Sequence, residues 1–106
     1  MEDRLRTFDE LWKLVEEIPP GKVCGYGALG KAMPHPVSGL LVGRWMAHCP
    51  ADVPWWRVVG ADGRLPIWKK DPNLEVVQHD RLVEEGVGFD LEGKVRMDDF
   101  AWTPDS

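Results

Sequence analysis

Residues 54–58 place two adjacent tryptophans, Trp55 and Trp56, directly before Arg57. Indole faces beside a guanidinium suit a stacked nucleic-acid base or a cation. In an extended segment successive side chains point to opposite faces, so at least one of the two indoles should point inward. The stretch therefore predicts either an aromatic binding site or a pair of core tryptophans.

A second candidate motif is the glycine pattern of Gly25, Gly27 and Gly30, which matches the GxGxxG sequence of dinucleotide-binding sites. Those sites need a buried strand before the glycines and a sustained helix after them. Here only a short connector precedes the motif, and Pro34 stops the helix that follows. We therefore expect a glycine-rich turn and no cofactor.

The two cysteines, Cys24 and Cys49, are candidates for nucleophilic or metal chemistry. The three histidines do not share zinc-ligand spacing with them, because the adjacent His48 and Cys49 have diverging side chains, so we expect no metal. A cysteine that meets a histidine in space would make the protein an enzyme, and this alternative stays open. A free Cys24 is otherwise typical of a small buried hydrophobe.

The first element that must position these residues is a helix over residues 8–18, where apolar side chains recur at helical spacing. Thr7 and Glu10 form a capping box at its start. Residues 19–21, Pro-Pro-Gly, end it, and residues 22–24 form a short connector that resembles a strand.

Two short helices follow, and their spacing predicts a helix-turn-helix. The first covers residues 26–33 and ends at Pro34. The second runs to about residue 47, with Ser38 as its N-cap.

The second half of the chain predicts smaller elements. Residues 58–65 alternate apolar and turn residues, which indicates a small hairpin or an ordered loop that could serve as a wing. Asn73 is the expected cap of a fourth helix, and Gly86 is its expected C-terminal residue. Residues 87–95 predict a terminal hairpin.

Length and composition indicate one folded domain over residues 1–106, with 43% hydrophobic and 29% charged residues. No apolar run approaches the roughly 20 residues that span a bilayer. The N-terminus is acidic, unlike a signal peptide. We expect a cytoplasmic protein without membrane contact.

The charge is unevenly distributed along the chain. Residues 1–20 carry a net −3, residues 21–70 a net +5 and residues 71–106 a net −7, within a total of −5. A basic middle segment could place one positive face against phosphate while the remaining surface stays anionic, or the charge could simply be uneven.

Several segments together resemble a known family. In the family's order and spacing they are residues 18–23 (IPPGKV), 26–29 (YGAL), 42–43 (VG), 54–59 (PWWRVV), 78–87 (QHDRLVEEGV), 93–95 (GKV) and Trp102. The chain resembles, over essentially its whole length, the DNA-binding domain of O6-alkylguanine-DNA alkyltransferases, and in particular their non-enzymatic relatives, the alkyltransferase-like proteins. The resemblance implies an α+β, mostly helical, winged helix-turn-helix-like fold.

The most specific element of the resemblance is Pro-x-x-Arg-Val. In alkyltransferases it reads Pro-Cys-His-Arg-Val, and its cysteine accepts the alkyl group. Here Trp55 stands at the cysteine position and Trp56 at the histidine position. An indole is neither a thiolate nucleophile nor a proton relay, so we expect a binding protein and no enzyme.

The resemblance also implies a set of DNA contacts. Tyr26 matches the tyrosine that crowds the target phosphate and helps to rotate the nucleotide out of the stack. Leu40 stands where the family has an intercalating arginine, and a leucine can still act as an apolar wedge. Arg44, one turn further on, and Lys31 are expected to contact phosphates or bases.

The resemblance implies that the partner is double-stranded DNA containing O6-alkylguanine, which a monomer would flag for nucleotide excision repair. The alternative is a DNA-binding or protein-interaction module of the same fold that has lost lesion recognition. Besides Tyr26, the expected lesion pocket consists of Trp55, Trp56, Arg57, Val58, Trp68 and Lys69.

Overall fold

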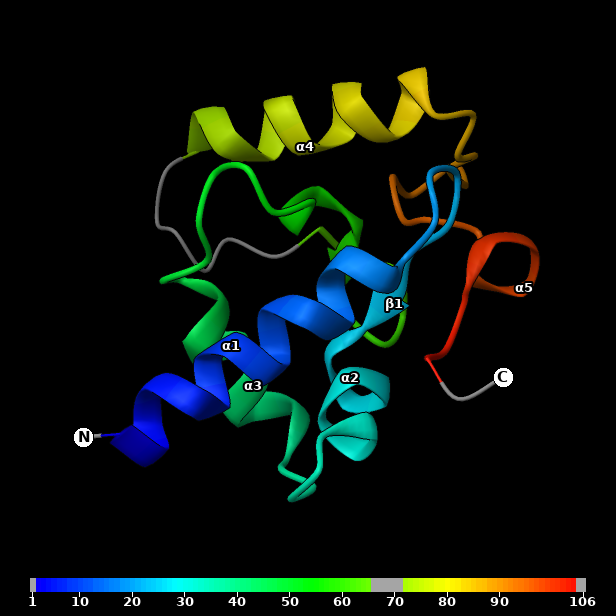
Figure 1. The fold of residues 1–106 in the computed structure, drawn as a ribbon. Helices are drawn as coiled ribbons and strands as arrows, with labels where there is room; N and C mark the ends of the chain where they lie inside the picture. Colours follow the sequence, from blue (N-terminus) through cyan, green and yellow to red (C-terminus); the bar gives the residue numbers. More distant parts are fainter. Residues whose placement is uncertain (1, 66–71, 105–106) are drawn as a thin grey trace.

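Helix α1 (Glu2–Glu17) lies across one face of the molecule in the computed structural model, which describes residues 2–65 and 72–104 (Figure 1). Leu11 and Val15, one turn apart on this helix, are fully buried. The amphipathic spacing predicted from the sequence therefore faces the core.

The predicted start of this helix is wrong. It begins at Glu2 and not at Thr7, so Thr7 and Glu10 lie inside it and do not cap it. Residues 2–6 contain neither proline nor glycine, so nothing in their sequence stops the helix from extending backwards.

A two-stranded parallel sheet joins the two halves of the chain. Strand β1 (Cys24–Gly25) pairs with β2 (Val58–Val59), in the register Cys24 to Val58 and Gly25 to Val59. All four residues are buried. The predicted strand character of the connector is confirmed, and its partner is β2.

The segment after β2 is an ordered loop and not a hairpin. The Gly60 amide donates to the Arg64 carbonyl at 2.9 Å, and Gly63 has a φ of 91° that favours glycine. Strand β2 pairs with β1 and not with residues 64–65. Of the two structures predicted for this segment, the loop is therefore the correct one.

Helices α2 (Tyr26–Ala32) and α3 (Gly39–Met46) form the predicted helix-turn-helix. Ser38 caps α3, since its Oγ accepts a hydrogen bond from the Leu41 amide at 3.2 Å. A Cβ on Gly30 would lie 2.3 Å from the Val37 carbonyl oxygen. The glycine pattern thus permits close packing of the turn against α2, which is a structural role.

The 3-10 helix η1 (Trp55–Arg57) leads directly into β2, and α4 (Pro72–Glu84) packs against it. The predicted cap of α4 is wrong, because the helix starts at Pro72 and Asn73 lies inside it. A proline fits the first turn, where no amide hydrogen is needed. The end of α4 is as predicted, because Gly86 has a φ of 89° and the Val87 amide donates to the Leu82 carbonyl.

The C-terminal segment closes the fold. Phe89 and Val95 form an antiparallel bridge, which confirms the predicted hairpin. Helix α5 (Met97–Phe100), absent from the predicted elements, follows it. Ala101 then forms a parallel bridge with Val23, beside β1.

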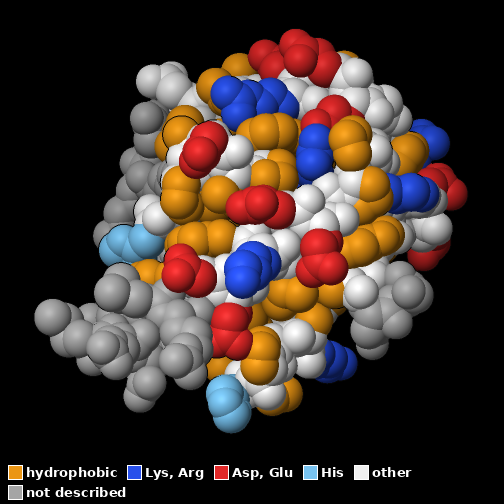
Figure 2. Space-filling model, in the orientation of Figure 1, with side chains coloured by type: hydrophobic (Ala, Val, Ile, Leu, Met, Phe, Trp, Pro, Cys, Tyr) orange, Lys and Arg blue, Asp and Glu red, His pale blue; other side chains and the backbone are white. Residues whose placement is uncertain are grey.

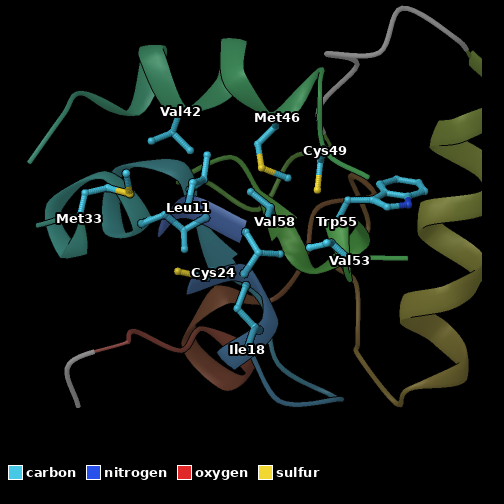
Figure 3. Close-up of a cluster of buried hydrophobic side chains, with 12 residues drawn as sticks. Leu11, Ile18, Cys24, Met33, Val42, Met46, Cys49, Val53, Trp55 and Val58 are labelled. Atoms are coloured by element: carbon cyan, nitrogen blue, oxygen red, sulfur yellow. The ribbon is translucent and has the colours of Figure 1, made fainter. Parts of the chain in front are cut away.

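The buried side chains form two clusters on either side of the sheet. The smaller comprises Val23, Val59, Leu82, Val87 and Val95. Figure 3 shows the larger, which comprises Leu11, Val15, Ile18, Cys24, Leu29, Met33, Val42, Met46, Cys49, Val53, Trp55 and Val58. The α+β, mostly helical fold class is confirmed. Among the described residues, no helix has the length and apolar character needed to cross a membrane.

Candidate nucleic-acid interface

The outer face of α3 carries two of the predicted DNA-binding residues. Leu40 is 73% exposed, although it is a large apolar side chain. Arg44 is also exposed, and positions four residues apart share one face of a helix. An apolar side chain and a guanidinium therefore point to the same side of the helix-turn-helix.

Tyr26 lies against the same helix. Its ring is 3.9 Å from the position that a Cβ on Gly43 would occupy. Burial, with a further contribution from the negative charge of Asp62, raises the pKa of Tyr26 above its ordinary value. The hydroxyl is therefore neutral at physiological pH and can donate a hydrogen bond to a phosphate.

Lys31 is exposed on α2. It borders a hollow of about 380 Å³ that the helix shares with the loop after β2 and with the C-terminal segment, lined also by Gly27, Ala28, Ala32, Ala61 and Thr103. The Lys31 ammonium can bind an anion beside α2. The face that α1 crosses carries mixed charge, because Figure 2 shows acidic and basic side chains interspersed there.

Trp55 is a core residue and only 4% exposed. Its ring meets that of Trp56 edge to face, with the centroids 6.1 Å apart and the planes at 87°. Figure 3 shows the Trp55 indole at the end of the core nearest α4. One indole is therefore inside the core, as the alternation predicts, and the other is half-buried beside it.

Glu85, just past the end of α4, holds the neighbouring part of this segment. Its carboxylate accepts hydrogen bonds from Trp56 Nε1 at 2.9 Å, Arg57 Nη2 at 2.7 Å and the Gly21 amide at 3.1 Å. Burial alone would raise the pKa of Glu85, but these hydrogen bonds outweigh it and hold the pKa below its ordinary value. The carboxylate is ionised and fixes both side chains.

Arg57 is equally restrained, with its side chain 12% exposed. Its Nη1 donates to the Ile18 carbonyl at 2.9 Å, just after α1. Val58 is fully buried in β2. The Arg57 and Val58 side chains thus connect elements of the fold.

Gln78 of α4 forms hydrogen bonds to the backbone of residues 56–58. It is fully buried, and its Nε2 donates to the carbonyls of Trp56 at 3.2 Å and Val58 at 3.0 Å. One amide thereby fixes the backbone on both sides of Arg57. Its Oε1 is buried without a hydrogen-bond partner among the described residues.

Arg81, also on α4, places its guanidinium 4.6 Å from the ring centroid of Trp56 and 5.8 Å from that of Trp55. Gln78, Arg81 and Glu85 are not among the predicted site residues. One sequence signal could have found Glu85, because a carboxylate next to the negative end of a helix dipole needs a specific partner.

The structure groups the predicted residues in two places. Tyr26, Leu40 and Arg44 gather at α3, whereas Trp55–Arg57 gather against α4. Trp68 and Lys69 lie outside the described residues.

The cysteines have no exposed thiol. Cys24 is fully buried, and burial raises its pKa to about 12. Cys49 is 4% exposed. A thiolate is the reactive form of cysteine, so Cys24 is unsuited to be a nucleophile at neutral pH. Among the side chains described, those of residues 7–65 and 73–104, no three histidine, cysteine or acidic groups could hold a metal together.

Two relatives and one solved structure show what this chain is similar to. Alkyltransferase-like protein 1 of Schizosaccharomyces pombe is 34% identical over 92% of this chain and 94% of its own length. A DNA base-flipping protein of Vibrio parahaemolyticus is 27% identical over 90% and 94%. The structure of S. pombe Atl1 in complex with damaged DNA containing O6-carboxymethylguanine superposes with a TM-score of 0.78, at 30% identity over 98% of both chains.

The family model of the 6-O-methylguanine DNA methyltransferase DNA-binding domain matches residues 6–87. This match spans the helix-turn-helix, the tryptophan pair and Glu85. The chain therefore belongs to the family of the 6-O-methylguanine DNA methyltransferase DNA-binding domain and, within it, to the alkyltransferase-like proteins.

Proposed function

We propose that this protein recognises O6-alkylguanine in double-stranded DNA by rotating the damaged nucleotide out of the stack, without changing it chemically. The observation that carries the proposal is the tryptophan pair in the Pro-x-x-Arg-Val element of a chain of this family. One relative of known structure with the same overall fold, S. pombe Atl1, is bound to DNA containing O6-carboxymethylguanine.

The absence of alkyl transfer follows from the side chains at the site. Trp55 offers no thiolate, and the indole of Trp56 donates to Glu85 and cannot relay a proton. The buried Cys24 stays protonated, since its pKa is about 12. Recognition without transfer is the chemistry that these residues support.

The exposed face of α3 supports a flipping mechanism. Leu40, 73% exposed, would enter the base stack as a wedge in place of the rotated nucleotide. Tyr26 would crowd the target phosphate, and Lys31 and Arg44 would bind neighbouring phosphates. Each of these roles belongs to the proposal.

The rotated base would enter beside Trp55, Trp56, Arg57 and Val58, with Trp68 and Lys69, which precede α4 in the sequence, as further members of the pocket. Glu85 and Gln78 hold this wall in place before DNA arrives. Since Trp55 is 4% exposed, a base can reach its ring only when the side chains that cover it move aside.

The remaining parts of the proposal concern the repair partners, the location, the oligomeric state and the domain organisation of the protein. The bound complex would mark the lesion for nucleotide excision repair proteins. The protein would act as a cytoplasmic monomer, and residues 1–106 would form one domain.

Two measurements on the same duplexes test the proposal. Affinity should be higher for a duplex with one O6-methylguanine than for the unmodified duplex, and a fluorescent base analogue beside the lesion should report unstacking. A radiolabelled methyl group should stay on the DNA. Label on the protein would refute the non-enzymatic reading.

The second candidate function is a module that binds DNA or protein without recognising lesions. It is favoured by Leu40, which cannot donate hydrogen bonds to the base left without its partner. Equal affinity for the damaged and unmodified duplexes, without any unstacking signal, would establish this candidate instead.

A further inference from the structure

Arg81 is an exposed cation beside the tryptophan pair. Its guanidinium lies over the ring of Trp56 at 4.6 Å and reaches to within 5.8 Å of the Trp55 centroid. The neighbouring Arg57 also contacts the Trp56 ring, at 5.3 Å, but is nearly buried and bound to Glu85. Of these two arginines, Arg81 is the one that solvent can reach.

The charge of Arg81 is available to a ligand. Asp80, the preceding residue, lies 3.5 Å from His79 Nδ1, and Glu85 is occupied by Arg57, Trp56 and Gly21. Among the described residues, no carboxylate lies within ion-pair distance of Arg81. An arginine that is oriented by aromatic rings and free of a counter-ion is well placed to bind an anion.

A base that stacks on the side of the Trp56 indole that faces Arg81 would meet this guanidinium, which lies 4.6 Å from the ring centroid. We propose that Arg81 is a specificity-determining residue of the lesion pocket and favours O6 substituents that carry a negative charge, such as a carboxymethyl group. This inference rests on the proposed function. A carboxylate accepts charge-assisted hydrogen bonds from a guanidinium, whereas a methyl group accepts none.

The experiment compares three duplexes of one sequence, which contain guanine, O6-methylguanine or O6-carboxymethylguanine at one position. Affinities are measured for the wild type, Arg81→Gln and Arg81→Lys. Arg96→Gln is the matched control, since Arg96 is an exposed arginine at the start of α5. Thermal denaturation checks that each variant is folded.

The wild type should bind the carboxymethyl duplex more tightly than the methyl duplex. Arg81→Gln should reduce that preference about 10-fold or more, because charge-assisted hydrogen bonds are lost. Its preference for O6-methylguanine over guanine should stay unchanged. Arg81→Lys should retain part of the preference for the charged adduct, and Arg96→Gln should retain all of it.

Three results would overturn the inference. The first is an unchanged preference for the carboxymethyl duplex in Arg81→Gln. The second is an equal loss of affinity for all three duplexes, which would show that Arg81 contacts a phosphate. The third is Arg81→Lys behaving like Arg81→Gln, which would show that the positive charge at position 81 does not determine the preference for the carboxymethyl duplex. Failure of the proposed function is distinguishable, because the wild type would then prefer neither lesion to guanine.

Discussion

The carboxylate of Glu85 connects three parts of the chain that are far apart in sequence. It accepts hydrogen bonds from Gly21 after α1 and from Trp56 and Arg57 of η1. The Arg57–Glu85 ion pair is nearly buried, with side chains 12% and 16% exposed. Removing one partner would leave the other charge without compensation, which is costly in a buried position.

The first prediction concerns the pH dependence of this contact. The pKa of Glu85 lies below its ordinary value of 4.5 in the folded chain, so ionised Glu85 stabilises the fold above that pH. The stabilisation should disappear as the pH falls from 4.5 through the lower folded-state pKa. Glu85→Gln should cost about 1–3 kcal/mol of unfolding free energy near neutral pH.

Denaturant titrations at a series of pH values measure this effect. The difference in unfolding free energy between the wild type and Glu85→Gln should shrink as the solution becomes acidic. Glu84→Gln, at the adjacent exposed position, is the control and should leave the pH profile unchanged. A difference between the wild type and Glu85→Gln that is constant with pH would contradict the assignment.

The second prediction concerns Trp55. As a core residue it should cost about 3–5 kcal/mol of folding stability when changed to alanine. In the protein that remains folded, loss of stacking should lower affinity for O6-methylguanine DNA about 5- to 150-fold. Binding to unmodified DNA should change little.

Val53→Ala is the control for Trp55→Ala, because Val53 is buried in the same cluster but offers no ring. It should reduce stability without changing the preference for the lesion. Thermal denaturation and affinities for both duplexes are measured side by side. An unchanged lesion preference in well-folded Trp55→Ala would remove Trp55 from the pocket.

At the residue scale, the sequence predicts which side chains matter but not how they are held. Trp55 and Trp56 stand out by type and adjacency, and alternation places one of them inside. Glu85, Gln78 and Arg81 make these contacts with residues 20 or more positions away. The place of Glu85 just past a helix end is a local signal that it needs a partner. The identity of the partners of all three residues is encoded by no local pattern, so only the folded chain reveals it.

At the element scale, the packing of α2 against the turn before α3 depends on one glycine. A Cβ on Gly30 would meet the Val37 carbonyl oxygen at 2.3 Å, and backbone atoms cannot yield as a flexible side chain can. The Val37 amide also donates to the Gly30 carbonyl at 3.0 Å. The close contact between α2 and the turn therefore determines the orientation of α3 relative to α2.

The third prediction follows from that close contact. Gly30→Ala should force α2 and the turn apart and cost about 1–3 kcal/mol of stability. Gly27→Ala is the matched control on the same helix, since a Cβ there would meet nothing within 4 Å. It should be neutral or stabilise the helix by about 0.5–1 kcal/mol. Equal destabilisation by both substitutions in thermal denaturation would contradict the packing argument.

Elements with local signals are the ones that could be predicted. Ser38 caps α3 and Gly86 ends α4 because each signal acts within a few residues. The pairing of β1 with β2 is different, since it joins Cys24 to Val58. A two-residue strand has too little periodicity to indicate which strand pairs with it. For the same reason, the sequence of the segment after β2 is compatible with a hairpin as well as with a loop.

At the scale of the whole molecule, the +5 segment 21–70 contains the helix-turn-helix, and the acidic ends contain α1, α4 and α5. The fourth prediction is that binding to DNA weakens as salt rises, with log affinity falling by about 0.9 per phosphate contact for each log unit of salt. Lys31→Ala and Arg44→Ala should each reduce this slope by about that amount.

Affinities for an unmodified duplex at several salt concentrations measure the slope. Arg96→Ala, in the acidic C-terminal segment, is the control and should leave it unchanged. Affinity that is the same at low and physiological salt would show that the basic segment does not bind phosphate.

The bridge between Val23 and Ala101 has a consequence for how the chain folds while it is being made. The Val23 amide donates to the Phe100 carbonyl at 2.9 Å, and the Trp102 amide donates to the Val23 carbonyl at 2.8 Å. Synthesis proceeds at about 5–20 residues per second, so residues 23–59 leave the ribosome seconds before their C-terminal partners exist. During that interval β1 has an unpaired edge and Val23 an uncovered side chain. The smaller buried cluster, to which Val23 belongs, therefore cannot close until Leu82, Val87 and Val95 have been made.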